Sequence, residues 1–236
     1  MKPIRIFRHL LCKPPGYLGD YLQQRSIPWE VECVDESQPI NPRTDDVSAL
    51  VFMGAAVSVN DRLPWMEGEL ALIRRAIQEG VPILGVCFGA QMMSRALGGE
   101  VTRGADMEIG WHPVQAIPGN DDDNWLQGLP ERFTAFHWHA DTFTLPAGSR
   151  WILESDYYPH QGFALGDHLG LQFHLEMTSE MVKGWIDRYG GDLVSGATCR
   201  QSKEMILHDL DRHIARLHEI SDVIYGNWLE RVLSRL

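Results

Sequence analysis

The sequence comprises 236 residues, of which 44% are hydrophobic and 22% are charged. A chain of this length and composition can bury a large core, which excludes intrinsic disorder as a description of the whole protein. Its formal net charge of −11 opposes binding to nucleic acid and to anionic membranes, because both need a positive protein surface. We therefore expect neither nucleic acid nor membrane as a partner.

The N-terminal segment and the cysteines indicate a cytoplasmic protein. Residues 1–12 contain no long apolar run and no small-residue cleavage site, so no signal peptide is expected. No segment approaches the roughly 20 consecutive apolar residues that span a bilayer. The spacing of the cysteines favours no disulfide, and we expect free thiols at Cys12, Cys33, Cys87 and Cys199.

Short apolar runs alternate with amphipathic stretches over the first hundred residues. Strands are predicted at residues 3–7, 29–34, 47–53 and 81–86, and helices at residues 17–27, 65–78 and 88–97. The fourth strand is almost entirely apolar, which is typical of a strand covered on both faces. This alternation predicts an α/β fold with a mostly parallel central sheet.

The remainder of the chain is predicted to be a β-rich middle followed by helices. Short β-like runs occur near residue 101 and at residues 108–117, 132–136, 151–154, 162–165 and 170–173. Thr178 is the expected N-cap of a helix that ends at Tyr189. The tail carries apolar residues at helical spacing, which predicts one or two helices with Gly226 as the candidate break. We expect a single domain over residues 1–236, with a C-terminal helical extension over about 200–236.

The most informative segment is Gly85-Val86-Cys87-Phe88-Gly89, which joins an apolar strand to a helix. This arrangement matches a nucleophile elbow with cysteine in place of serine. The glycines leave room for the tight turn, and the start of the helix favours a thiolate. The backbone N–H of Phe88, directly after the nucleophile, is placed to stabilise an oxyanion. Cys87 is therefore the candidate nucleophile.

A base for this thiol is available in Gln172-Phe173-His174-Leu175-Glu176, at the end of another apolar run. Residues two apart on a strand point to the same face, so Glu176 can orient His174 through one ring nitrogen. The other nitrogen can then take the thiol proton. Nucleophile, base and orienting acid together form a catalytic triad.

The order of these motifs resembles the class I (triad-type) glutamine amidotransferase family over roughly residues 45–180. Within it, the chain looks most like stand-alone relatives of the glutaminase half of GMP synthase. Residues 85–91 resemble the nucleophile segment, and residues 172–176 resemble the His-Pro-Glu segment with Leu175 in place of proline. Residues 51–61 resemble the Gly-Gly-Pro oxyanion loop, although Ala55 and Ala56 replace its second glycine and its proline.

The resemblance implies a flavodoxin-like sheet with helices on both faces and the site at the carboxyl ends of the strands. It implies hydrolysis of a γ-carboxamide through a Cys87 thioester, with release of ammonia and with no cofactor or metal. The backbone N–H groups of Ala55 and Phe88 would form the oxyanion hole. Gly54 and Gln91 would contact the substrate, which is glutamine or another γ-glutamyl compound.

The sequence leaves the fate of the ammonia open. It contains neither a Walker A sequence nor an ATP-pyrophosphatase loop, so the chain cannot by itself activate an acceptor with ATP. A separate synthetase subunit would then take up the ammonia. The alternative is a γ-glutamyl peptidase that uses the same triad. A non-catalytic module that has kept the fold is a further alternative.

A second constellation, His137-Trp138-His139-Ala140-Asp141, keeps a metallohydrolase among the alternatives. Two histidines two apart on a strand can reach one Zn²⁺ ion, and Asp141 would complete the set. The known metal signature continues with a histidine, however, and Thr142 stands there. The amidotransferase resemblance instead implies that His139 and Asp141 shape the wall of the substrate pocket.

Overall fold

The computed structural model describes residues 1–9, 15–34, 40–119, 124–193 and 198–235. Its strands are β1 (Ile4–Arg8), β2 (Trp29–Cys33), β3 (Ala49–Phe52), β4 (Ile83–Val86), β5 (Val101–Ala116), β6 (Arg132–Phe143), β7 (Arg150–Ser155), β8 (Gly162–Leu165) and β9 (His168–Leu171). Its helices are α1 (Tyr17–Gln24), α2 (Met66–Gln78), α3 (Phe88–Ala96), α4 (Ser179–Tyr189), α5 (Lys203–Leu207) and α6 (Leu210–Leu233), with short 3₁₀ turns η2 (Val59–Asp61) and η4 (Gly190–Asp192).

All nine strands form one sheet in the order β2-β1-β3-β4-β9-β8-β7-β5-β6. The pairs from β2 to β9 are parallel, and the pairs from β9 to β6 are antiparallel. The parallel half has the 2-1-3-4 strand order of flavodoxin-like folds, with β9 as its fifth strand. The predicted α/β class is therefore confirmed, and the β-rich middle of the chain forms an antiparallel extension of the same sheet.

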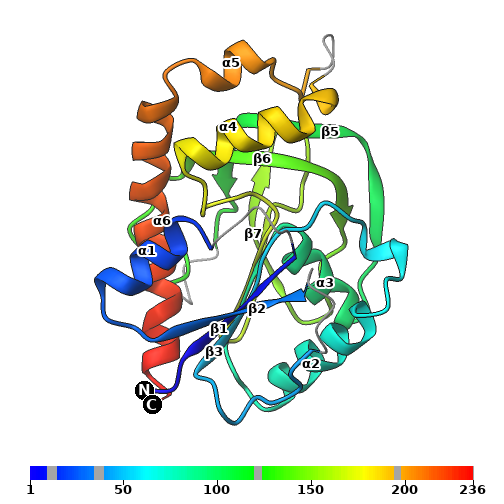
Figure 1. Cartoon of the computed structure of the whole chain (residues 1–236), viewed down its shortest axis with the longest axis vertical. Coiled ribbons are helices and arrows are strands. Elements are labelled where there is room, and N and C mark those ends of the chain that lie inside the picture. Colours follow the sequence, from blue (N-terminus) through cyan, green and yellow to red (C-terminus); the bar gives the residue numbers. More distant parts are fainter. Residues whose placement is uncertain (10–14, 35–39, 120–123, 194–197, 236) are drawn as a thin grey trace.

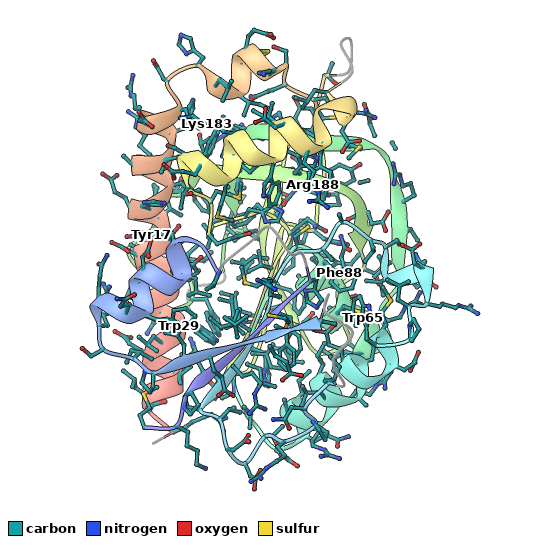
Figure 2. All side chains as sticks on the ribbon, in the orientation of Figure 1. Tyr17, Trp29, Trp65, Phe88, Lys183 and Arg188 are labelled. Atoms are coloured by element: carbon teal, nitrogen blue, oxygen red, sulfur yellow. The ribbon has the colours of Figure 1, made fainter. Side chains whose placement is uncertain are left out.

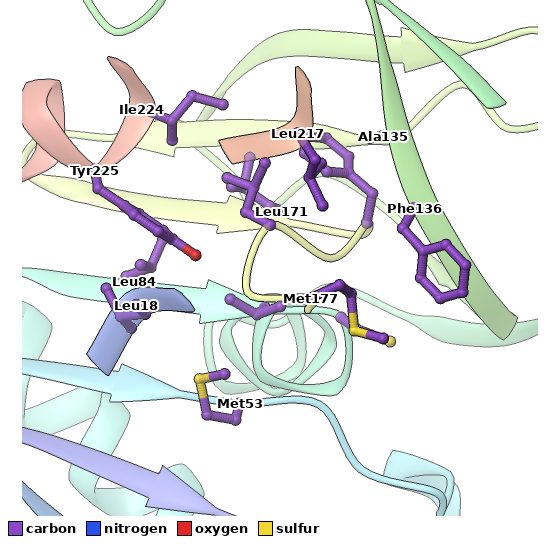
Figure 3. Close-up of a cluster of buried hydrophobic side chains, with 14 of the residues drawn as sticks. Leu18, Met53, Leu84, Ala135, Phe136, Leu171, Met177, Leu217, Ile224 and Tyr225 are labelled. Atoms are coloured by element: carbon purple, nitrogen blue, oxygen red, sulfur yellow. The ribbon is translucent and has the colours of Figure 1, made fainter. Parts of the chain in front are cut away.

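Helices cover both faces of the parallel half (Figure 1). Both faces need a cover because successive side chains of a strand point to opposite sides of the sheet. Ile4 and Ile6 of β1 join one apolar cluster with α1 and α6, whereas Phe7 joins another with α2 and α3. Figure 3 shows part of the first cluster, in which Tyr225 of α6 lies with Leu18 of α1 and Leu84 of β4. Burial on both faces explains why the central strands β3 and β4 are apolar throughout.

Several predicted boundaries differ from the structure. The runs near residue 101 and at residues 108–117 belong to one long strand, β5, and the run at residues 132–136 continues to Phe143 as β6. The tail breaks before Leu210 rather than at Gly226, which lies inside α6. A helical glycine costs only about 1 kcal/mol relative to alanine, and the burial of Tyr225 and Trp228 on either side outweighs that cost.

The last helix, α6, is bound to the segment that carries His174. The hydroxyl of Ser221 is fully buried and lies 2.9 Å from the carbonyl oxygen of Leu175, to which it can donate. Leu217 and Val232 of the same helix are also fully buried. The expectation of one domain over the whole chain stays a prediction, although this packing supports it.

Among the described residues, no helix combines the length and the apolar character needed to cross a bilayer. Cys33, Cys87 and Cys199 are free thiols, whereas Cys12 lies outside the described residues. The predicted helix after Thr178 is confirmed as α4, and the Thr178 side chain accepts a hydrogen bond from the backbone N–H of Met181.

Candidate active site

The candidate residues lie at one edge of the sheet, after the carboxyl ends of three adjacent parallel strands. Gly54 lies just after β3, Cys87 follows β4 directly, and His174 lies three residues beyond β9. Because the carboxyl ends of neighbouring parallel strands meet at the same edge, these residues converge despite their separation in sequence. All three line one cavity of about 360 Å³.

Cys87 occupies the strained elbow between β4 and α3, with φ 52° and ψ −106°. A positive φ is unusual for a residue with a Cβ atom and is often found at functional sites. Close packing explains the flanking glycines. A Cβ on Gly89 would lie 2.0 Å from the carbonyl oxygen of Phe52, and one on Gly85 would lie 2.5 Å from the sulfur of Met93. The two glycines therefore allow β4 and α3 to approach closely enough to form the turn.

Phe88, the first residue of α3, secures the start of this helix. Its ring packs edge-on against those of Trp65 and His9, with centroid distances of 5.8 Å and 5.1 Å. Phe88 and Trp65 are labelled near one another in Figure 2. The first N–H groups of an α-helix have no partner within the helix, so the N–H of Phe88 is available to a ligand. Ala55 lines the same cavity, as expected for a second oxyanion donor.

His174 and Glu176 form a buried pair beside this elbow. His174 Nδ1 lies 2.7 Å from Glu176 Oε1, and the two side chains are 1% and 3% exposed. The pair does not lie on β9 as the sequence suggests. It lies in the segment after that strand, where the backbone N–H of His174 donates to the carbonyl oxygen of Phe136. The expected orientation of His174 by Glu176 is therefore present, on irregular backbone.

The environment of His174 favours its protonated form. Burial disfavours the charge, but the carboxylate of Glu176 and the sulfur of Cys87 outweigh it and raise the pKa of His174 to about 9. Its Nε2 is buried and has no partner of ordinary hydrogen-bond geometry within the described residues. Gly54 leaves room for the side chains of His174 and Cys87. A Cβ on Gly54 would lie 2.9 Å from His174 Cε1 and 3.7 Å from Cys87 Cβ.

A chain of amides next to Cys87 was not predicted from the sequence. Gln172 Nε2 lies 3.6 Å from Cys87 Sγ, and its Oε1 accepts a hydrogen bond from Gln91 Nε2 at 3.2 Å. Gln91 also donates to the carbonyl oxygen of Asp141 at 3.1 Å. The one available signal was the position of Gln172 two residues before His174. Gln91 therefore both lines the cavity and links α3 to β6.

Aromatic and charged side chains complete the cavity wall. Trp185 packs edge-on against the ring of His174, with 4.8 Å between ring centroids. Trp138 and Tyr189 extend this aromatic side, and Arg103 brings a positive charge to the wall. The pocket can thus hold a polar group near Cys87 and apolar parts of a substrate farther out.

The His-x-His-x-Asp segment takes a different arrangement from the metal trio considered above. His139 and Asp141 line the cavity, as the resemblance implies. The Asp141 carboxylate accepts a hydrogen bond from the Ser58 hydroxyl at 2.5 Å. Glu108 of β5, which the sequence did not single out, lies against His137 and His139 instead. Asp141 is therefore not the acid that meets the two histidines in the structure, since Glu108 lies there and the Asp141 carboxylate accepts from Ser58.

Comparison with known proteins gives consistent similarities. Residues 17–184 match the family model described as glutamine amidotransferase class-I. A crystal structure of a glutamine amidotransferase from Methylobacillus flagellatus is 36% identical, with a TM-score of 0.93 over 98% of this chain and 95% of that one.

Two curated relatives are glutamine-hydrolyzing GMP synthases. The one from Sulfurisphaera tokodaii is a separate synthase subunit, and it is 29% identical over 72% of this chain and 84% of its own length. The one from Latilactobacillus sakei is 28% identical over 72% of this chain, and the match spans 32% of its length.

Proposed function

Because the chain belongs to the class I glutamine amidotransferase family, we propose that it hydrolyses the γ-carboxamide of glutamine through a Cys87 thioester and releases ammonia. The observation that carries this proposal is the meeting of three groups at one edge of the sheet. A cysteine with φ 52° begins a helix, and His174, which is paired with the buried Glu176, lines the same cavity. This arrangement has the roles of nucleophile, base and orienting acid.

The proposed reaction uses these groups in sequence. The Cys87 sulfur attacks the carboxamide carbon, and the N–H groups of Phe88 and Ala55 stabilise the oxyanion. His174, having taken the thiol proton, returns it to the departing ammonia. A water molecule, deprotonated by His174, then hydrolyses the thioester to glutamate and the free thiol. Glu176 holds the imidazole in place and stabilises its positive charge.

The substrate contacts and the partner are part of the same proposal. Gly54 and Gln91 contact the bound carboxamide, and the ammonia passes to a separate synthetase subunit. The relatives support the second point, because one is named a subunit of GMP synthase and another is a GMP synthase about three times as long as the match. No cofactor is assigned to the hydrolysis.

A γ-glutamyl peptidase is the second candidate, and the aromatic wall favours it. Trp138, Trp185 and Tyr189 line the cavity beyond Cys87, where a leaving group larger than ammonia would lie. This activity would use the same thioester and differ only in the amine released.

Substrate turnover by matched cysteine variants tests the proposal. Wild-type protein should release ammonia from glutamine, Cys87→Ala should lose this activity while keeping its circular dichroism, and Cys33→Ala should keep it. A glutamine-like chloroketone should label Cys87 alone. The same screen with γ-glutamyl peptides decides between the two candidates by the ratio of their kcat/KM values. Ammonia release that survives in Cys87→Ala would refute the mechanism.

A further inference from the structure

A cluster of buried ligand-type side chains lies behind the cavity wall, on the antiparallel half of the sheet. Glu108 of β5 pairs with His139 of β6, and His137 lies two residues away on the same face. Glu108 and His137 are fully buried, and His139 is 4% exposed. One potential ligand atom from each residue lies within 4.8 Å of the other two. The triad reaction described above uses none of these three groups.

Both imidazoles face the same carboxylate oxygen. His139 Nε2 lies 2.8 Å from Glu108 Oε2, and His137 Nδ1 lies 3.2 Å from it. Ligand atoms bound at about 2.0–2.1 Å in a tetrahedral zinc site lie about 3.3 Å apart. The two histidine-to-carboxylate distances are therefore close to this separation, and a small outward movement of the rings would accommodate an ion.

The hydrogen bonds of His139 leave its inner nitrogen in need of a cation. Its Nδ1 lies 3.0 Å from the carbonyl oxygen of Asp141, which can only accept, so Nδ1 carries a hydrogen. In the neutral ring, Nε2 then directs a lone pair at a carboxylate oxygen, which is repulsive. Either an additional proton or a metal ion at this point removes the repulsion.

The surroundings of His137 favour a bound metal ion over an additional proton on His139. Its Nδ1 lies 3.2 Å from Glu108 Oε2 without hydrogen-bond geometry, so this nitrogen has no hydrogen-bond partner within the described residues. A proton on His139 leaves His137 unsatisfied in a fully buried position, which is costly. One divalent ion binds the lone pairs of both imidazoles and of the carboxylate together.

Surrounding residues hold Glu108 and His139 as they would around a metal, whereas Nε2 of His137 has no hydrogen-bond partner in the described part of the chain. Gln161 Nε2 donates to Glu108 Oε2 at 2.6 Å, and the Ser155 hydroxyl donates to Glu108 Oε1 at 2.7 Å. The Asp141 carbonyl fixes the ring of His139. Hydrogen bonds of this kind, which orient a ligand from behind, accompany almost every histidine–metal bond.

From this geometry we propose that Glu108, His137 and His139 bind one zinc ion, which braces the wall of the catalytic cavity. Two imidazoles and one carboxylate suit zinc, and its fourth position would be taken by water. The carbonyl of Asp141 accepts from both His139 and Gln91, so the ion would stiffen the contact between β6 and α3. The ion is a positioning element, and Cys87 remains the nucleophile.

Metal titration of the full-length chain tests this site. Protein stripped with a chelator should bind one equivalent of Co²⁺ with the visible absorption of a tetrahedral complex, and Zn²⁺ should displace it. Added Zn²⁺ should also raise the thermal midpoint, because it binds only the folded chain. Folded wild-type protein that binds no stoichiometric metal at micromolar concentration would overturn the proposal.

Variants locate the ion. Glu108→Gln and His137→Gln should weaken binding by about 100-fold or more, and Gln161→Leu by about 10- to 100-fold. His208→Gln, at a side chain 79% exposed, should bind as the wild type does. Cys87→Ala should also retain the ion, which separates this site from metal captured by the thiol. Loss of metal binding in Cys87→Ala together with its retention in His137→Gln would contradict the assignment. Circular dichroism identifies any variant that fails to fold.

Discussion

Replacing Glu176 by glutamine removes the charge next to His174 but keeps a side chain of the same shape. In the wild type, 2.7 Å separates Glu176 Oε1 from His174 Nδ1, and both groups are buried. The glutamine carbonyl can still accept from Nδ1, so the ring keeps its orientation. The negative charge that helps to raise the pKa of His174 to about 9 is lost. The substitution therefore tests electrostatics more than position.

The consequence is expected in the pH dependence of glutamine hydrolysis. Wild-type kcat/KM should fall as the pH rises through about 9, because the pKa of about 9 is that of the free enzyme and His174 must be protonated to release ammonia. In Glu176→Gln this basic limb should move down by roughly 1 to 3 pH units. The value of kcat at its optimum should fall by about 10²- to 10⁴-fold.

The free energy of unfolding should also depend on the protonation of His174. A pKa of His174 raised from 6.5 to about 9 stabilises the folded state by about 3 kcal/mol. This contribution is fully present below pH 6.5 and is lost as the pH rises through 9. The difference in unfolding free energy between wild type and Glu176→Gln should therefore shrink over that interval.

The control is Glu219→Gln, which removes the same charge from an exposed position on α6 and should change neither profile. Initial-rate ammonia release and urea unfolding, each from pH 6 to 10, measure the two effects. If Glu176→Gln kept its basic limb near pH 9 with an unchanged kcat, the coupling between Glu176 and His174 would be disproved.

Three substitutions outside the proposed triad, one of them a control, test how the elbow and the last helix are held. Gly89→Ala should destabilise the fold by about 3 kcal/mol, because its Cβ would lie 2.0 Å from the Phe52 carbonyl oxygen. Gly184→Ala, in an open position on α4, should stabilise it by about 0.5–1 kcal/mol; equal urea midpoints for the two variants would contradict this account. Trp228→Ala should cost about 3–5 kcal/mol in a single unfolding transition, since Trp228 is fully buried. A separate early transition for α6 would instead show that residues 1–236 do not unfold as one domain.

Much of the catalytic site could be predicted because its signals are short-range. A strand, a Gly-x-Cys-x-Gly turn and a helix are contiguous, so the elbow at Cys87 is visible as a pattern. His174 and Glu176 are two residues apart, so their hydrogen bond is a local contact that a short sequence pattern can indicate. The meeting of these two segments was expected only through the family resemblance, which places the site at the carboxyl ends of the parallel strands.

Other features needed the whole structure. The tail helix continues through Gly226 because neighbouring side chains are buried against α1 and the sheet, which outweighs the local preference of glycine. The amide of Gln172 reaches Cys87 Sγ only because β9 lies beside β4. The Asp141 carboxylate meets the Ser58 hydroxyl, a residue 83 positions earlier in the chain.

The sequence alone determined the α/β class and singled out Cys87 and His174 as the candidate nucleophile and base, because adjacent residues carry that information. The partner of His137 and His139 was decided by tertiary structure. A register unbroken from the pairing of Arg103 with Asp141 would set Phe136 opposite Glu108, but the strands slip between Arg103 and Glu108. That irregularity brings Glu108 opposite His139, and nothing local in the chain specifies it, since strand register depends on the packing of both strands against the core.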